Sequence, residues 1–119
     1  FVQRAGIAAL TGDDAPVQKM NATFRERRDA IVSGLNTIPG VSCTIPEGAF
    51  YAFPNVSQLT TDDKHLAKWL LENAGVACLG GSSFGAAGKG YLRFSYAASL
   101  DDIGWALDQL REALPRYHA

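Results

Sequence analysis

The stretch "GKGYLRFSYAAS", residues 88–99, contains the side chain best suited to bind an anion, Arg93. Leu92, Phe94 and Tyr96 alternate as the apolar face of a strand does, so Arg93 is expected on the opposite, polar face. A guanidinium grips a carboxylate through two parallel hydrogen bonds, and a strand presents such a group rigidly. Periodicity alone favours an ordinary surface or cross-strand ion pair, so the spacing leaves the role of Arg93 open.

Other patterns that carry chemistry do not complete a site in this sequence. The glycine-rich run "GGSSFGAAGKG" precedes a strand and lacks the Lys-Ser/Thr ending of a phosphate-binding loop. His65 falls on the wet side of a predicted helix and His118 lies near the C-terminus, so no serine has a credible base. Cys43 and Cys78 lie in apolar runs without metal-ligand neighbours, which predicts buried thiols and no metal site. Helix capping explains the acidic pairs Asp13-Asp14, Asp62-Asp63 and Asp101-Asp102.

Length and composition indicate one globular domain. The chain has 119 residues, of which 47% are hydrophobic and 19% charged, as in ordinary folded proteins. A formal net charge of -1 offers no long-range field for nucleic acid or an anionic membrane. No apolar run approaches the roughly 20 residues that span a bilayer. We therefore expect a soluble, cytoplasmic protein with no nucleic-acid or membrane partner.

The elements that must position Arg93 follow the order ααββαββα. Helices are expected near residues 2–11, 13–35, 60–75 and 99–115, and the second is too long for the core of so small a domain. Two strands, 41–45 and 49–53, are separated by the turn signal "PEG" and are expected to pair antiparallel. A third strand ends at residue 80 and a fourth surrounds Arg93. The prediction is an α+β fold, with helices packed on a small, mostly antiparallel sheet of about four strands.

Several of these segments resemble the C-terminal part of the class I/II, fold-type I, pyridoxal-phosphate (PLP)-dependent aminotransferases. The likeness is carried by "PEGAFYAFPNVS", by Phe84-Gly85 and by "GYLRFSYAAS". The opening "FVQRAGIAAL" and the pattern through residues 20–29 extend it over nearly the whole chain. It is most similar to the bacterial-type aspartate aminotransferase branch. The family usually has proline where this sequence has Gly80.

The resemblance implies a role for Arg93. In that family the arginine of this motif binds the α-carboxylate of the amino-acid substrate, which orients the Cα–H bond toward the cofactor. Phe50, Tyr51 and Phe84 are candidates to line the site. The family's catalytic lysine and its other PLP-binding residues belong to a larger preceding domain, and none of the four lysines here matches that motif. The resemblance thus implies no catalytic or cofactor-binding residue within these 119 residues.

The resemblance also implies how the chain fits into an enzyme. Residues 1–119 would be the C-terminal small domain, with 1–38 as connecting helices and 39–119 as the α/β core. The full enzyme would be a homodimer that transfers the amino group of L-aspartate to 2-oxoglutarate, and these residues alone would be inactive. Three alternatives remain open: a related PLP-dependent lyase, a free-standing small-ligand-binding or regulatory module, and an interaction domain in which Arg93 makes an ion pair.

Overall fold

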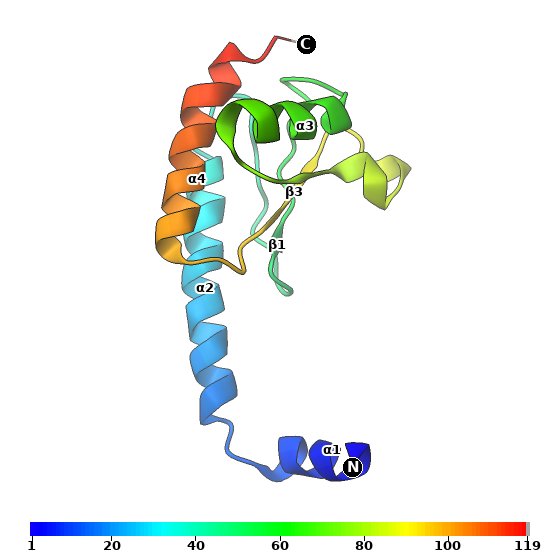
Figure 1. Ribbon diagram of the computed structural model, residues 1–119, viewed down its shortest axis with the longest axis vertical. Helices are drawn as coiled ribbons and strands as arrows, with labels where there is room; N and C mark the ends of the chain where they lie inside the picture. The colour runs from blue at the N-terminus through cyan, green and yellow to red at the C-terminus, as the bar shows by residue number, and fades with distance from the viewer. Residues whose placement is uncertain (119) are drawn as a thin grey trace.

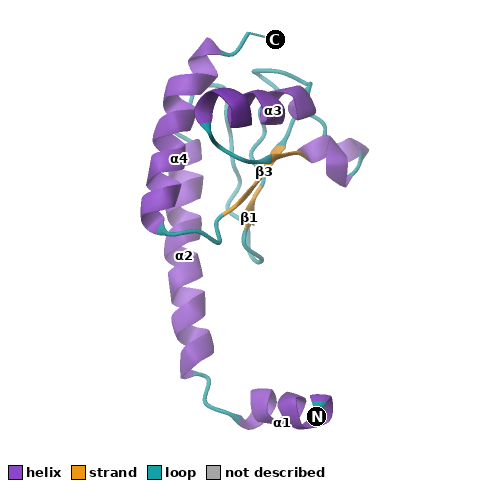
Figure 2. Ribbon diagram, viewed as in Figure 1, coloured by secondary structure: helices purple, strands orange, loops and turns teal. Residues whose placement is uncertain are grey.

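The computed structural model describes residues 1–118 and combines helices with a small antiparallel sheet (Figures 1 and 2). Its helices are α1 (Val2–Thr11), α2 (Ala15–Leu35), α3 (Asp63–Ala74) and α4 (Leu100–Ala113). Its strands are β1 (Tyr51–Ala52), β2 (Leu79–Gly80) and β3 (Leu92–Ser95). Short 3₁₀ turns are η1 (Gly81–Phe84), η2 (Ala86–Gly88) and η3 (Leu114–Arg116). The predicted α+β class and the four predicted helices are confirmed.

The sheet has three strands rather than the predicted four, in the order β1-β3-β2. Both outer strands pair antiparallel with β3, so β3 lies at the centre of the sheet. The register places Tyr51 opposite Ser95 on one side and Leu79 opposite Arg93 on the other. The strand that carries Arg93 is therefore held by hydrogen-bonded neighbours on both edges.

The predicted strand at residues 41–45 is wrong, and so is its antiparallel pairing with residues 49–53. Only Ser42 in this segment forms a bridge, with Asn55. The Asn36 side chain accepts a hydrogen bond from the Cys43 backbone N–H at 2.8 Å and donates one to its carbonyl at 2.9 Å. A side-chain amide thus satisfies the backbone groups that a neighbouring strand would otherwise pair. Strand β1 pairs instead with β3.

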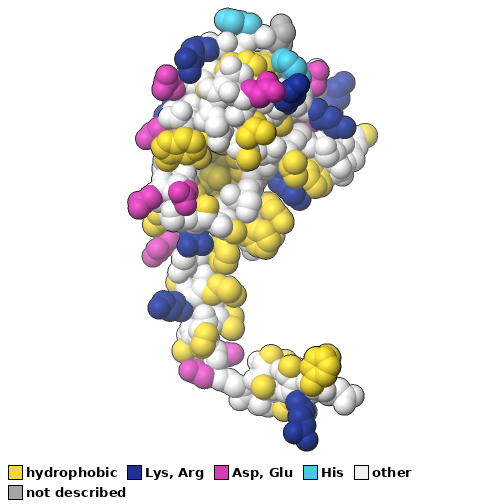
Figure 3. Space-filling model, viewed as in Figure 1, with side chains coloured by type: hydrophobic (Ala, Val, Ile, Leu, Met, Phe, Trp, Pro, Cys, Tyr) yellow, Lys and Arg dark blue, Asp and Glu magenta, His cyan; other side chains and the backbone are white. Residues whose placement is uncertain are grey.

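Helix α2 extends well beyond the core, as its predicted length indicated. Its buried residues are confined to the last two turns, from Ile31 to Leu35, whereas Val17 and Met20 are about half exposed. The first turns of α2 and all of α1 project from one end of a molecule 54 Å long (Figure 1). Apolar side chains gather on this projecting part (Figure 3). Among the described helices, none is long and apolar enough to cross a membrane.

The core lies between the sheet, the end of α2, and the apolar faces of α3 and α4. Leu66 and Leu70 of α3 are fully buried, at the helical spacing expected for one face. Helix α4 begins at the predicted cap, where the Ser99 side chain accepts a hydrogen bond from the Asp102 N–H at 3.0 Å. Its inward face carries Ile103, Leu107 and Leu110. These faces fix the sheet, and hence the strand that carries Arg93.

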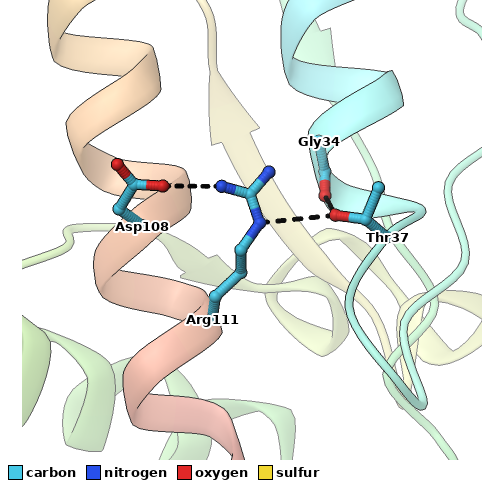
Figure 4. Close-up of polar contacts among 4 residues, drawn as sticks. All are labelled: Gly34, Thr37, Asp108 and Arg111. Atoms are coloured by element: carbon cyan, nitrogen blue, oxygen red, sulfur yellow. Dashed lines mark hydrogen bonds and ion pairs between the residues drawn. The ribbon is translucent and has the colours of Figure 1, made fainter.

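Helices α2 and α4 lie side by side and are joined at the end of α2 (Figures 1 and 4). Arg111 of α4 donates to Asp108 at 2.6 Å and to the Thr37 hydroxyl at 3.4 Å. That hydroxyl donates in turn to the Gly34 carbonyl at 2.7 Å. A Cβ on Gly34 would collide with the side chain of Leu107, so the glycine permits this close approach.

Gly34→Ala tests this packing. We expect the variant to lose about 1–2 kcal/mol of unfolding free energy, because overpacking against Leu107 outweighs the higher helix propensity of alanine. Gly104→Ala is the matched control, since a Cβ at Gly104 in α4 meets nothing within 4 Å. The unfolding free energy of Gly104→Ala should rise by about 0.5–1 kcal/mol. Urea unfolding measures the change in both variants. If both substitutions stabilised the protein equally, the close approach of Gly34 to Leu107 would be contradicted.

Candidate functional site

Arg93 lies on the polar face of the central strand, as the alternation predicted. Leu92, Phe94 and Tyr96 are at most 6% exposed and belong to the core. Arg93 is half-buried on the other face of β3. Its backbone is fixed from both sides by β1 and β2. The guanidinium is therefore presented from a rigid position in the middle of the sheet.

Two aromatic rings flank the guanidinium of Arg93. Its Cζ lies 4.3 Å from the centroid of the Tyr51 ring and 4.1 Å from that of the Phe84 ring. Tyr51 comes from β1 and Phe84 from η1, the turn that directly follows β2, so the two rings come from opposite sides of β3. Cation–π contacts stabilise the charge without accepting hydrogen bonds from its edge. The N–H groups remain free to bind a ligand.

No acidic side chain of residues 1–118 neutralises Arg93. The four ion pairs found there use Arg28, Lys68, Arg111 and Arg116 as their cations. Arg93 is the only charged residue lining a pocket of about 190 Å³, together with Tyr51, Ala77, Cys78, Leu79 and Ser95. This arrangement, a fixed cation in a hollow without a protein anion, can bind a carboxylate.

The structure brings two of the three predicted lining residues onto Arg93. Phe50 lies one ring further away, with its centroid 4.4 Å from that of Tyr51. Two aromatic residues that the sequence reasoning missed extend the cluster: Phe53 stacks on Tyr91 at 5.4 Å and meets the edge of Phe84 at 6.3 Å. Strand alternation contained the signal, since Phe53 and Tyr91 lie two residues from Tyr51 and Arg93, respectively.

Asp63 also corrects the sequence analysis, because it does not cap a helix. Asp62 caps α3 by accepting from the His65 N–H at 3.1 Å. The Asp63 carboxylate is buried and accepts from the Ser82 hydroxyl at 2.7 Å, the Ser82 N–H at 3.2 Å and the Gly90 N–H at 3.0 Å. Burial alone would raise the pKa of Asp63, but these hydrogen bonds outweigh it and hold the pKa below its usual range.

The glycine-rich segment 80–90 packs tightly, as expected for a structural loop. A Cβ on Gly81 would collide with the Gly88 carbonyl oxygen, and a Cβ on Gly88 would collide with the Gly81 backbone. The Gly81 N–H also donates to the Tyr91 carbonyl at 2.8 Å. Together with Asp63, these contacts close the segment into a compact loop that carries Phe84 toward Arg93.

Burial disfavours the charged thiolate form of both cysteines. Burial raises the pKa of Cys78, which lines the Arg93 pocket, to about 12, so the thiol is neutral at physiological pH. Burial likewise raises the pKa of Cys43. Within residues 1–118, no group of three or more His, Cys, Asp or Glu side chains is placed to hold a metal ion. The Arg93 charge and the rings beside it can bind and orient an anion.

Comparisons with known proteins show the family to which the chain belongs. Residues 1–110 match the family described as aminotransferase class I and II. Aspartate aminotransferase of Pyrococcus horikoshii is 40% identical over 116 residues, which cover 96% of this chain and 30% of that protein. The structure of Rhizobium meliloti aspartate aminotransferase superposes with a TM-score of 0.87 at 35% identity, over 96% of this chain and 30% of that one. The structure of alanine aminotransferase from Pyrococcus furiosus superposes with a TM-score of 0.90 at 35% sequence identity, over 95% of this chain and 29% of that one. The chain thus spans about 30% of the relatives' length.

The depressed pKa of Asp63 makes the stability of the loop depend on pH. Because the folded-state pKa lies below the unfolded value, the stabilisation is present above about pH 3.9 and is lost as pH falls through the folded-state pKa. Asp63→Asn should therefore lower the unfolding free energy at pH 7 by about 1.5–3 kcal/mol, and by progressively less below pH 3.9. Urea unfolding across this range measures it, and a loss that is constant with pH would contradict the assignment.

Proposed function

Because the chain belongs to the class I and II aminotransferase family, we propose that Arg93 binds the α-carboxylate of the amino-acid substrate in the complete enzyme. One observation carries the proposal: a half-buried guanidinium, held by two rings, faces a pocket without a protein anion. Such a group is set up to receive an anion from outside the domain. A substrate carboxylate would take the two parallel N–H donors that the rings leave free.

The aromatic cluster would sharpen this contact in two ways. The rings of Tyr51 and Phe84 restrict the guanidinium, so less conformational entropy is lost when a carboxylate binds. They also exclude water beside the charge, which strengthens its attraction to the ligand. Phe50 packs on the Tyr51 ring, and Phe53, which stacks on Tyr91, meets the edge of the Phe84 ring. The residues of this chain thus contribute binding and orientation to the reaction.

Members of this family depend on PLP, which supplies the electron sink for amino-group transfer. We propose that the described residues do not form the PLP site by themselves. Their lysines Lys19, Lys64, Lys68 and Lys89 are all exposed, and none lines the pocket of Arg93. We propose that the rest of the polypeptide holds the cofactor, and that residues 1–119 alone are inactive.

We further propose the substrates of the complete enzyme and the place of this chain in it. The names of relatives support L-aspartate as the amino donor, and we propose 2-oxoglutarate as the acceptor. Coverage of about 30% of those relatives supports a small C-terminal domain, with residues 1–38 connecting to a larger domain and 39–119 forming the α/β core. The exposed apolar residues of α1 and of the first turns of α2 would pack against that domain or the second subunit of a cytoplasmic homodimer.

Arg93→Lys in the full-length holoenzyme tests the central role. We expect a higher KM for the amino acid and a loss of at least ~10-fold in kcat/KM, because one ammonium cannot replace a bidentate fork. Steady-state kinetics with L-aspartate and 2-oxoglutarate measure it. Arg116→Lys is the control, since Arg116 is exposed and its ion pair among residues 1–118 is with Glu112, four residues earlier. Unchanged kinetics in Arg93→Lys would reject the assignment.

A further inference from the structure

Asp63 is the one buried charged side chain of the described chain, with 2% of its surface exposed. Its two oxygens have different partners: Oδ1 accepts from the N–H and hydroxyl of Ser82, and Oδ2 accepts from the N–H of Gly90. Ser82 and Gly90 are the two ends of one loop. A single carboxylate from α3 therefore fastens both ends of that loop to a helix.

The loop between those ends carries a ring of the candidate site. Phe84 lies in the fastened segment, and its centroid is 4.1 Å from the Arg93 Cζ. Phe84 itself is 49% exposed, so its contact with the edge of Phe53 fixes the ring only in part. Its position depends on the backbone of the loop, and the carboxylate of Asp63 holds that backbone at both ends.

Gly80 leaves room for this carboxylate. A Cβ on Gly80 would lie 2.5 Å from the Asp63 Oδ1 and 3.0 Å from the Lys64 backbone nitrogen. The backbone of Gly80, with φ of -63° and ψ of 132°, is one that proline readily adopts. The absence of a side chain at this position therefore serves the close approach of Asp63 rather than an unusual backbone angle.

We propose that Asp63 is a positioning residue of the carboxylate site: it holds the loop so that Phe84 rests on Arg93 and fixes its guanidinium for the substrate. The inference rests on the proposed role of Arg93. Asp63 touches neither the substrate nor the guanidinium, and it acts only through the loop and the Phe84 ring. The buried Asp63 at the start of α3 thereby affects how tightly Arg93 on the central strand binds the substrate carboxylate.

The test uses the full-length holoenzyme with Asp63→Asn, and with Asp62→Asn as matched control. Asp62 is the neighbouring exposed cap, and asparagine caps a helix about as well as aspartate. We expect Asp63→Asn to raise KM for the amino acid about 10-fold with kcat changed less than about 2-fold. The inhibition constant of succinate, the donor without its amino group, should rise by the same factor. Asp62→Asn should change neither value.

Coupling to Phe84 separates positioning from a general loss of stability. If both residues act through the same ring, Asp63→Asn and Phe84→Ala together should weaken succinate binding about as much as the stronger single change, rather than by the product of the two. Independent effects that multiply would overturn the inference. So would an unchanged succinate constant in a folded Asp63→Asn enzyme.

A second variant keeps the test decisive if Asp63→Asn does not fold. Ser82→Ala removes the 2.7 Å hydroxyl bond and leaves the carboxylate and both backbone bonds in place. Ser82→Ala should weaken succinate binding by a smaller factor than Asp63→Asn. Combined with Phe84→Ala, it should weaken binding no further than Phe84→Ala alone. An unchanged inhibition constant of succinate in Ser82→Ala would overturn the inference. The Arg93→Lys enzyme distinguishes the two proposals: if Arg93→Lys binds succinate normally, the proposed function fails. If Arg93→Lys weakens succinate binding but the Asp63 and Ser82 variants bind succinate normally, only the positioning role fails.

Discussion

A half-buried guanidinium between two aromatic rings is the interaction on which this site depends. Partial burial makes the charge of Arg93 costly, and the usual remedy is a carboxylate from the same protein. Here the Tyr51 and Phe84 rings take that place, and no acid of residues 1–118 pairs with Arg93. Because the ring contacts leave the N–H groups unused, the proposed carboxylate ligand would find its donors available.

Three parts of the chain must meet to build this arrangement. Strand β3 supplies the cation, β1 supplies one ring, and the loop after β2 supplies the other. The antiparallel register fixes the first two relative to each other, while the Asp63 carboxylate of α3 fastens the loop. The end of α2 and the apolar faces of α3 and α4 bury the opposite face of the sheet and hold the strands in place. Helix packing on one face of the sheet thus fixes the positions of Arg93 and its neighbours on the other face.

The features that could be predicted from sequence were those that depend on local periodicity. Alternation in residues 91–96 placed Arg93 on the polar face, and helical spacing found the four helices. The errors arose where hydrogen bonds between a side chain and the backbone, which leave no periodic pattern in the sequence, decide the outcome. The Asn36 side chain occupies the backbone groups of Cys43, so an apolar, β-like run does not form a strand. Asp63 looked like a helix cap, and its partners lie 19 and 27 residues away in a loop.

The most direct measurement is a crystal structure of the full-length protein with succinate bound. The account predicts one carboxylate of the ligand within about 3 Å of both terminal nitrogens of Arg93, with the Tyr51 and Phe84 rings still against the guanidinium. A ligand held by another cation, with Arg93 paired to an acidic side chain of the protein, would contradict it.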